Sequence, residues 1–177
     1  STARGVLNEL RLDLAPEDFC ETPDSDALLE GESIRISVAR TVALVHDGSV
    51  SQTRTQAERV VEALADLGVV ALPEDRYYLM EQPYELYGDL PEVRPTGRLT
   101  PHRLIAELRK PIVLRVERAV PVTVDDGSVT FSFNTAARTV GAALFDQGLT
   151  VYEGDRVSPG LDAAITPGLR VRLDRAL

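Results

Sequence analysis

The chain has 177 residues, of which 44% are hydrophobic and 27% charged, a composition typical of a folded globular protein. Its formal net charge is −9, and its basic residues, all arginines except Lys110, are scattered along the sequence. Binding to phosphates requires clustered positive charge, so we expect no nucleic-acid partner. The sequence has no long uncharged apolar run, and we expect no segment embedded in a membrane.

Residue types that commonly carry chemistry are rare. The single cysteine, Cys20, cannot form an internal disulfide and is predicted to be a buried small hydrophobic side chain. The only histidines are His46, beside a predicted turn, and His102, in the first turn of a predicted helix. We expect both to face solvent, and we predict no metal site, no cofactor and no catalytic residue. The common nucleotide-binding, hydrolase and redox motifs do not occur.

The stretch 119–177 reads as a complete small domain. Two alternating apolar runs, 120–124 and 129–133, flank Asp126-Gly127, which is the pattern of a β-hairpin. A helix is predicted next, capped by Thr135 and ended at Gly148, with Val140, Ala143 and Leu144 on one face. A short extended piece from Leu149 and a final strand containing Val171 and Leu173 follow. The predicted fold class is α+β, in the order hairpin, helix, strand, strand.

The same spacing recurs earlier in the chain. In residues 39–118, Asp47-Gly48 takes the place of the turn, Thr55 with Glu58 forms a predicted capping box, and Asp75 follows Gly68 as Asp155 follows Gly148. In residues 1–38, Val6 and Leu10 match the helix pair Val140 and Leu144, and Asp18 precedes Gly31 as Asp155 precedes Gly168. The predicted domains are therefore 1–38, 39–118 and 119–177.

The first of these repeats is incomplete, because no hairpin precedes its helix. The predicted apolar stripe of that helix contains Val6, Leu7, Leu10 and Leu12, and leaving it in water would be costly. Two explanations stay open: a hairpin upstream of Ser1, or cover from a neighbouring repeat or another chain. The second would amount to self-association through the first helix.

The middle repeat contains an insertion at about 76–111. A short helix is predicted after Thr100-Pro101. The insertion also holds most of the tyrosines and the only methionine, residue types that recognition surfaces favour. It is interpreted either as a lid packed on its own repeat or as a partner-binding surface, with these candidate residues: Tyr77, Tyr78, Met80, Tyr84, Tyr87.

With these residues laid out, the repeats resemble a ubiquitin-like (β-grasp) domain of unknown function. That domain occurs in tandem in YabE-like cell-wall proteins and in resuscitation-promoting factors. The resemblance rests on the run from Arg118 to Gly127, on Thr135 to Val140, and on the later positions Leu144, Gly148, Asp155, Gly160 and Gly168. It implies an extracytoplasmic location on the bacterial cell surface, beside a separate module that remodels peptidoglycan.

Two functions follow as hypotheses. The first is a non-enzymatic spacer and docking module of a wall-associated protein. The second is a module that binds cell-wall glycan or a wall-associated protein through the tyrosine-rich insertion.

Overall fold

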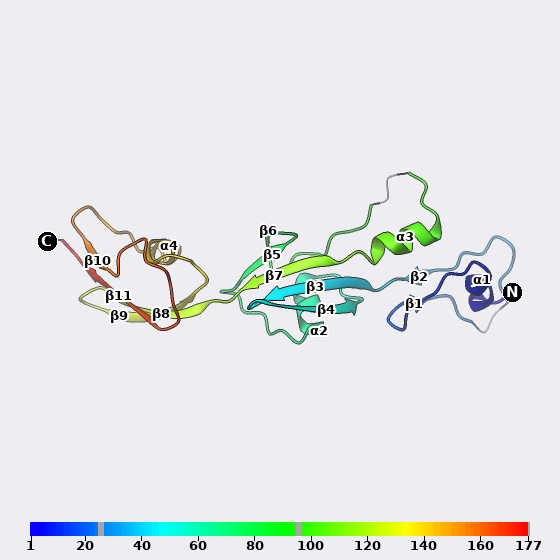
Figure 1. Cartoon of the computed structure of the whole chain (residues 1–177), viewed down its shortest axis with the longest axis horizontal. Coiled ribbons are helices and arrows are strands. Elements are labelled where there is room, and N and C mark those ends of the chain that lie inside the picture. Colours follow the sequence, from blue (N-terminus) through cyan, green and yellow to red (C-terminus); the bar gives the residue numbers. More distant parts are fainter. Residues whose placement is uncertain (25–26, 95–96, 177) are drawn as a thin grey trace. The chain divides into compact units, whose positions relative to one another are not determined.

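The computed structural model describes residues 1–24, 27–94 and 97–176. By their contacts these residues form two compact units, Ser1–Ala71 with Tyr78–Arg115, and Leu72–Tyr77 with Val116–Leu177. Helices and three separate sheets are present, and the predicted α+β class is confirmed. Figure 1 labels these helices and strands.

The sheet nearest the C-terminus has four strands in the order β10-β11-β8-β9. Strands β8 (Val120–Asp125) and β9 (Thr130–Thr135) form an antiparallel hairpin, and β11 (Leu169–Asp174) lies parallel to β8. Strand β10 (Arg156–Ser158) closes the other edge. Helix α4 (Val140–Asp146) lies in the same unit between the hairpin and β10 along the chain (Figure 1).

A small apolar core holds this domain together. The period of two in the strands and of 3.6 in α4 directs one face of each element inward. These faces supply a cluster of buried side chains, each at most 2% exposed: Val122, Val124, Val140, Leu144 and Val171. Phe131 and Phe133 on β9 stack against each other, 6.1 Å between ring centres, and close the cluster from the hairpin.

The middle sheet has five strands in the order β4-β3-β7-β5-β6. Its strands and helices, in chain order, are β3 (Arg40–His46), β4 (Ser49–Thr55), α2 (Val60–Asp66), β5 (Arg76–Leu79), β6 (Gln82–Tyr84), α3 (Pro101–Leu108) and β7 (Ile112–Glu117). The β3–β4 turn contains Asp47 and Gly48 at φ 47° and 76°, as its Asp-Gly pair predicts. If β7 is matched to β11 and β5 to β10, the strand order equals that of the four-stranded sheet, with β6 added at the edge.

The N-terminal segment contains helix α1 (Ala3–Glu9) and the short antiparallel strands β1 (Phe19–Cys20) and β2 (Ile36–Ser37). Its backbone repeats hydrogen bonds of the other two domains. The Leu28 amide donates to the Ser1 carbonyl at 2.8 Å, as Leu90 does to Glu58 at 2.7 Å and Ile165 to Arg138 at 3.0 Å. The segment thus shares this backbone hydrogen bond with the two hairpin–helix units.

The helix caps differ from those predicted. Thr139, not Thr135, caps α4 by accepting from the Ala142 amide, whereas Thr135 ends β9 and accepts from the Ala137 amide. In α2 the Glu62 carboxylate accepts from the amides of Glu58 and Arg59, so the predicted capping box of Thr55 and Glu58 is wrong. The hydroxyls of Thr55 and Thr135, at the ends of β4 and β9, each accept a hydrogen bond from the amide two residues later. Because of this local bend, each helix begins about one helical turn later in the sequence than predicted.

The predicted register of the first helix is also wrong by nearly one turn. Thr2 caps α1 as Thr139 caps α4, which places Ala3 and Leu7 at the inward positions. Leu10 is instead the C-cap residue and is 50% exposed. Arg11, at φ 52°, occupies the left-handed position that glycine holds after α2 and α4, and the absence of a glycine there hid the register.

Three smaller predictions differ from the structure. The short strand of the last domain is β10, after Asp155, and residues 149–151 form no strand. Val129 lies in the hairpin turn and is 59% exposed rather than part of β9. Cys20 is half-buried on β1, with its thiol 3.5 Å from the Thr22 carbonyl, and is therefore less buried than predicted.

Candidate functional site: the inserted segment and three aspartates

Tyr77 does not belong to a binding surface. It is 6% exposed, and its hydroxyl donates to the Leu72 carbonyl at 2.7 Å. Burial, together with the negative charge of Asp75, raises the pKa of Tyr77 to about 12. Tyr77 is the second residue of β5. Its ring faces inward because side chains alternate between the two faces of a strand. The prediction that it contacts a partner is corrected on this ground.

Tyr78 lies on the opposite face of β5, and Met80 lies in the turn between β5 and β6. The Tyr78 ring is half-buried beneath the Arg115 guanidinium, 3.8 Å from the ring centre, and Arg115 also bonds the Glu81 carboxylate at 3.2 Å. Met80 is 56% exposed, and its sulfur accepts from the Val113 amide at 3.3 Å. Met80 and Glu81 both have positive φ, which fits the tight turn between β5 and β6.

Tyr84 and Tyr87 present the exposed part of the insertion. Tyr84 is 37% exposed, donates to the Asp89 carbonyl at 2.7 Å, and packs its ring on Gly88. A β-carbon at Gly88 would lie 2.4 Å from that ring, so a larger residue there would require the Tyr84 ring to shift. Tyr87 is 68% exposed. Of the five candidate residues, the structure thus leaves Met80, Tyr84 and Tyr87 open to solvent, while Leu86 and Leu90 anchor the segment inward.

The helix of the insertion contacts the N-terminal segment. As predicted, α3 begins after Thr100, whose hydroxyl accepts from the Arg103 amide. His102 lies 3.3 Å from the Arg11 carbonyl, and Arg109 donates to the Asp13 carbonyl and to Asp18, both at 2.9 Å. The insertion is therefore more than a lid on its own repeat, because α3 braces residues 11–18 within the same unit.

Three aspartates at equivalent positions form the most regular polar feature of the chain. In each case one carboxylate oxygen accepts from the amide three residues earlier, and the other accepts from the amide of an alanine beyond the final strand. An arginine donates to every one of these carboxylates. We call each arrangement a clamp, and the three clamps are those of Asp18, Asp75 and Asp155.

The Asp18 clamp lies in the first unit. Its carboxylate is fully buried and accepts from Ala15 and Ala39, both at 2.8 Å, and from Arg54 and Arg109 at 2.7 and 2.9 Å. Burial alone would raise the pKa of Asp18, but these hydrogen bonds and the two arginines outweigh it, and the pKa is lowered. Ala39 directly precedes β3, so the clamp holds the entry of that strand.

The Asp75 clamp lies in the second unit. Its buried carboxylate accepts from Leu72 at 3.3 Å, Ala119 at 2.8 Å and Arg118 at 2.7 Å. Ala119 directly precedes β8, as Ala39 precedes β3. A buried carboxylate satisfied in this way fixes the backbone on both sides of it.

The Asp155 clamp repeats the pattern at the end of β11. Tyr152 and Ala176 donate to its two oxygens, both at 2.9 Å, and Arg175 donates at 3.0 Å. The backbone hydrogen bonds from Tyr152 and Ala176 lower the pKa of Asp155 most; burial opposes them, and Arg175 lowers the pKa further. The sequence spacing matched these three aspartates to one another, and the structure gives each of them the same three kinds of partner: an amide three residues earlier, an alanine amide and an arginine.

The arginines of the clamps were missed in the sequence. A signal was present, because Arg118-Ala119 and Arg175-Ala176 end two of the repeats with the same dipeptide. The two arginines that contact Asp18 come from elsewhere in the chain: Arg54 lies on β4, and Arg109 follows α3. Sequence spacing could not reveal these two, since they reach Asp18 only through the tertiary fold.

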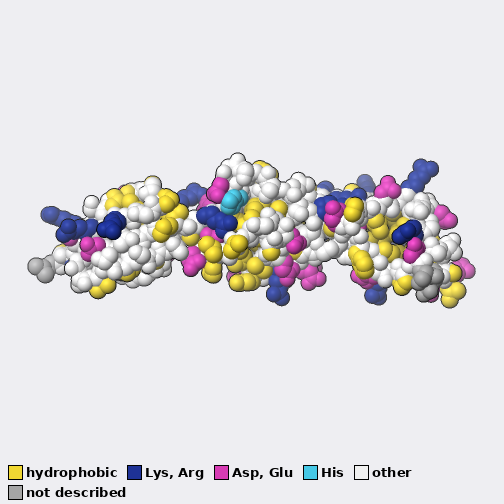
Figure 2. All heavy atoms as spheres, turned by 90° about the horizontal axis from the view of Figure 1, so that it is seen from below, with side chains coloured by type: hydrophobic (Ala, Val, Ile, Leu, Met, Phe, Trp, Pro, Cys, Tyr) yellow, Lys and Arg dark blue, Asp and Glu magenta, His cyan; other side chains and the backbone are white. Residues whose placement is uncertain are grey.

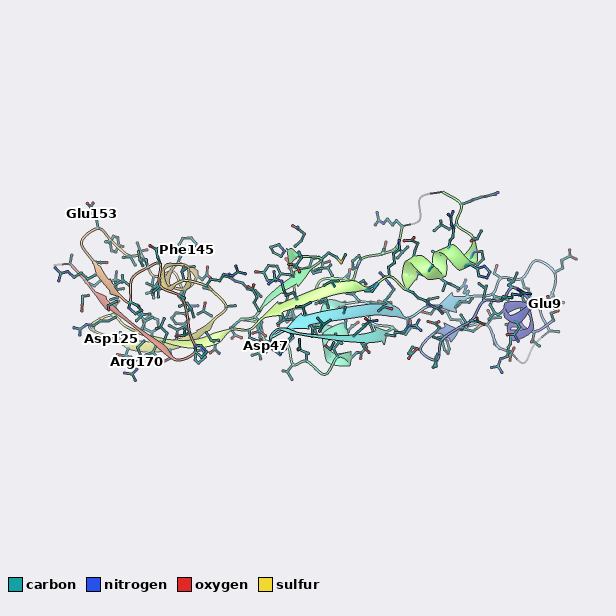
Figure 3. All side chains as sticks on the ribbon, viewed as in Figure 1. Glu9, Asp47, Asp125, Phe145, Glu153 and Arg170 are labelled. Carbon is teal, nitrogen blue, oxygen red and sulfur yellow. The ribbon has the colours of Figure 1, made fainter. Side chains whose placement is uncertain are left out.

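The surface offers no concentrated charge on the visible side. In Figure 2, basic and acidic side chains are interspersed over the face shown. In the C-terminal domain, Phe145 on α4 is 81% exposed and lies on the other side of the domain from Asp125 and Arg170 (Figure 3). Tyr152 is 66% exposed, so this domain also carries exposed aromatic rings outside the insertion.

Among residues 1–24, 27–94 and 97–176, the side chains form no group of three or more metal ligands. His46 bonds its neighbour Asp47 at 3.2 Å beside the β3–β4 turn. None of the helices described is both long and apolar enough to cross a bilayer.

Two stretches of the chain, one in each hairpin–helix unit, are similar to a known family. Residues 42–76 and 122–162 match the family described as the G5-linked ubiquitin-like domain, and the resemblance inferred from the sequence is confirmed. The chain is also similar to resuscitation-promoting factor Rpf2 of Corynebacterium glutamicum, with 22% identity over 174 residues. The alignment covers 98% of this chain but 40% of that relative.

Proposed function

We propose that this chain is a non-catalytic spacer and docking module on the bacterial cell surface, built from tandem β-grasp repeats of which the first lacks its hairpin. The similarity to a resuscitation-promoting factor and to the G5-linked ubiquitin-like family supports a wall-associated context. The repeated hydrogen bonds of the three segments support the tandem arrangement, with boundaries near residues 38 and 118.

The clamps carry the spacer proposal. Only two residues separate β2 from β3, and only two separate β7 from β8. The second residue of each pair, Ala39 or Ala119, has its amide bound to a buried aspartate. A flexible Gly/Ser linker would leave such residues free in water, whereas each of these two amides is hydrogen bonded to a buried carboxylate of its own unit.

Amide hydrogen exchange tests this proposal. We expect the amides of Ala39 and Ala119 to exchange at least about tenfold more slowly than unstructured controls, because each is hydrogen bonded to a buried carboxylate. Asp75→Ala, which removes the acceptor of the Ala119 amide, should release Ala119 and leave Ala39 protected. Exchange of both amides at intrinsic rates in the unmodified chain would mean that the connections are ordinary linkers.

A second function is a module that binds cell-wall glycan or a wall-associated protein through the insertion. The observation that favours it is the exposure of Met80, Tyr84 and Tyr87 on and beside β6. Retention on purified peptidoglycan tests it, with these three residues replaced by serine and with Phe145 and Tyr152 replaced by serine as the matched control. Loss of retention in the first variant alone supports binding through the insertion, and equal retention excludes it.

A further inference from the structure

Strand β9 lies at an edge of the four-stranded sheet, and no strand in the described part of the chain pairs with its outer side. The Asp126 amide donates to the Val129 carbonyl at 3.1 Å, and hydrogen-bonded pairs alternate from there along the hairpin. Thr130, Ser132 and Asn134 therefore direct their amides and carbonyls away from β8. Such a row of backbone groups is a template for the addition of another strand.

This edge has none of the usual protections. Sheet edges in soluble proteins commonly carry a charge, a proline or a bulge, or are very short, and each of these features blocks pairing with another chain. Among the described edge strands, β4 contains Arg54, β6 contains Pro83, and β10 has three residues beginning with Arg156. Strand β9 instead has six residues, TFSFNT, without a charge or a proline.

The absence of charge limits the kind of partner that fits. Residues 127–137 form the longest stretch of the chain without Asp, Glu, Lys or Arg, in a sequence with a formal net charge of −9. Two copies of the chain would repel each other over much of their surface, but at β9 they meet without like charges. A strongly acidic or basic partner would find no complementary charge on this strand.

The sequence of β9 is also nearly symmetric about Ser132. If two copies pair antiparallel with Ser132 opposite Ser132, each outward amide meets an outward carbonyl, and Thr130 lies opposite Asn134. Phe131 of one copy then faces Phe133 of the other at positions where cross-strand side chains come closest. Both rings are half-buried and already stacked within one chain, so pairing extends an existing aromatic cluster.

We propose that β9 is a self-association site, at which two copies of the chain pair antiparallel about Ser132 and join their four-stranded sheets. The interface is a strand edge, and it differs from the apolar stripe of the first helix that the sequence suggested. This inference goes beyond the spacer and docking function and does not depend on it.

The test places charge at the centre of the interface in the full chain. Ser132→Lys sets two lysines opposite each other, and Ser132→Asp sets two aspartates opposite each other. Gln52→Lys is the matched control, because exposed Gln52 on β4 lies opposite Ala43 as exposed Ser132 on β9 lies opposite Thr123. Sedimentation equilibrium over a wide range of protein concentration measures association.

We expect the unmodified chain and Gln52→Lys to associate equally. Each Ser132 variant alone should associate at least about tenfold more weakly, because like charges directly opposite each other destabilise a strand pair. An equimolar mixture of Ser132→Lys and Ser132→Asp should recover association, since opposite charges then meet. This recovery also shows that both variants are folded.

Three results would overturn the site: an unmodified chain that is monomeric at every concentration, Ser132 variants that associate as strongly as the unmodified chain, or a mixture that does not recover association. None of these results changes the protection of the Ala39 and Ala119 amides, which tests the spacer proposal. Failure of this inference is therefore distinguishable from failure of that proposal.

Discussion

The five-stranded and four-stranded sheets show how one strand order accommodates very different connections. In the four-stranded sheet a short chain runs from β10 to β11, and Leu161 in it packs closely on Gly141 of α4. In the five-stranded sheet β6, α3 and the tyrosines lie between the corresponding strands β5 and β7. The order of the shared strands is unchanged. The insertion enters at a sheet edge, where added chain disturbs no existing pair.

The largest effect should come from breaking the shared core in one sheet alone. Val140 is 0% exposed and belongs to the cluster with Val122, Val124 and Leu144. Val140→Asp would bury an unpaired charge, and we expect a loss of at least about 4 kcal/mol of unfolding free energy for the C-terminal domain. Denaturant titration measures the loss.

Phe145→Asp, one turn away on the exposed face of α4, is its control and should change the free energy of unfolding by less than about 0.5 kcal/mol. Val60 occupies the corresponding buried position on α2, and Val60→Asp should damage the five-stranded sheet in the same way. Tolerance of Val140→Asp would mean that the two helices are not equivalent.

The next effect concerns the Asp75 clamp in the second unit. Asp75→Asn keeps the shape of the side chain but removes the charge that the Arg118 guanidinium faces at 2.7 Å. We expect about 2–3 kcal/mol of destabilisation, typical of a buried charged partner left unpaired. Denaturant titration of Asp75→Asn beside Arg118→Ala and the double variant gives the coupling of the pair. Additive effects of the two substitutions would contradict the clamp.

An acid titration should measure how much the Asp18 clamp contributes to the free energy of unfolding. The pKa of Asp18 is lowered in the folded state from the usual 3.8, so the unfolded chain takes up the proton first as the pH falls. The contribution of Asp18 is therefore complete above pH 3.8 and declines below it. In Asp18→Asn this part of the acid dependence should vanish, as followed by stability measurements between neutral pH and acid. An unchanged acid profile would exclude Asp18 as a source.

An alkaline titration gives a further, smaller signal from the strand after the second clamp. Burial raises the pKa of Tyr77 to about 12, from a usual value of 10.0. Ultraviolet absorbance should show Tyr77 ionising near pH 12, well above its usual value. The contribution of Tyr77 to stability is present below pH 10.0 and is lost as the pH rises toward about 12. Tyr77→Phe should remove this step.

Substitutions at the exposed surface of the insertion should affect the free energy of unfolding least. Tyr87 is 68% exposed, and Tyr87→Ser should change the unfolding free energy by less than about 0.5 kcal/mol. Gly88→Ala, its neighbour, should cost more because the new methyl group would meet the Tyr84 ring. Thermal unfolding of both variants makes the comparison, and an equal loss would show that the Tyr84 ring moves freely.

Local patterns determined much of this protein. Alternation around Asp47-Gly48 and Asp126-Gly127 predicted both hairpins. The spacing between glycines and aspartates predicted that Asp18, Asp75 and Asp155 occupy equivalent positions. These signals suffice because turns, strand alternation and helix ends depend on residues close in sequence. The Thr100-Pro101 cap predicted α3 for the same reason.

The tertiary structure decided what the sequence left open. Tyr77 is buried because of the register of β5. Tyr87 is exposed because Leu86 and Leu90 are the residues of that segment that pack inward. Arg54 and Arg109 meet at Asp18 although they lie 36 and 91 residues from it. Such meetings depend on how elements pack, since burial and long-range pairing are properties of the whole fold, and no local pattern in the sequence encodes them.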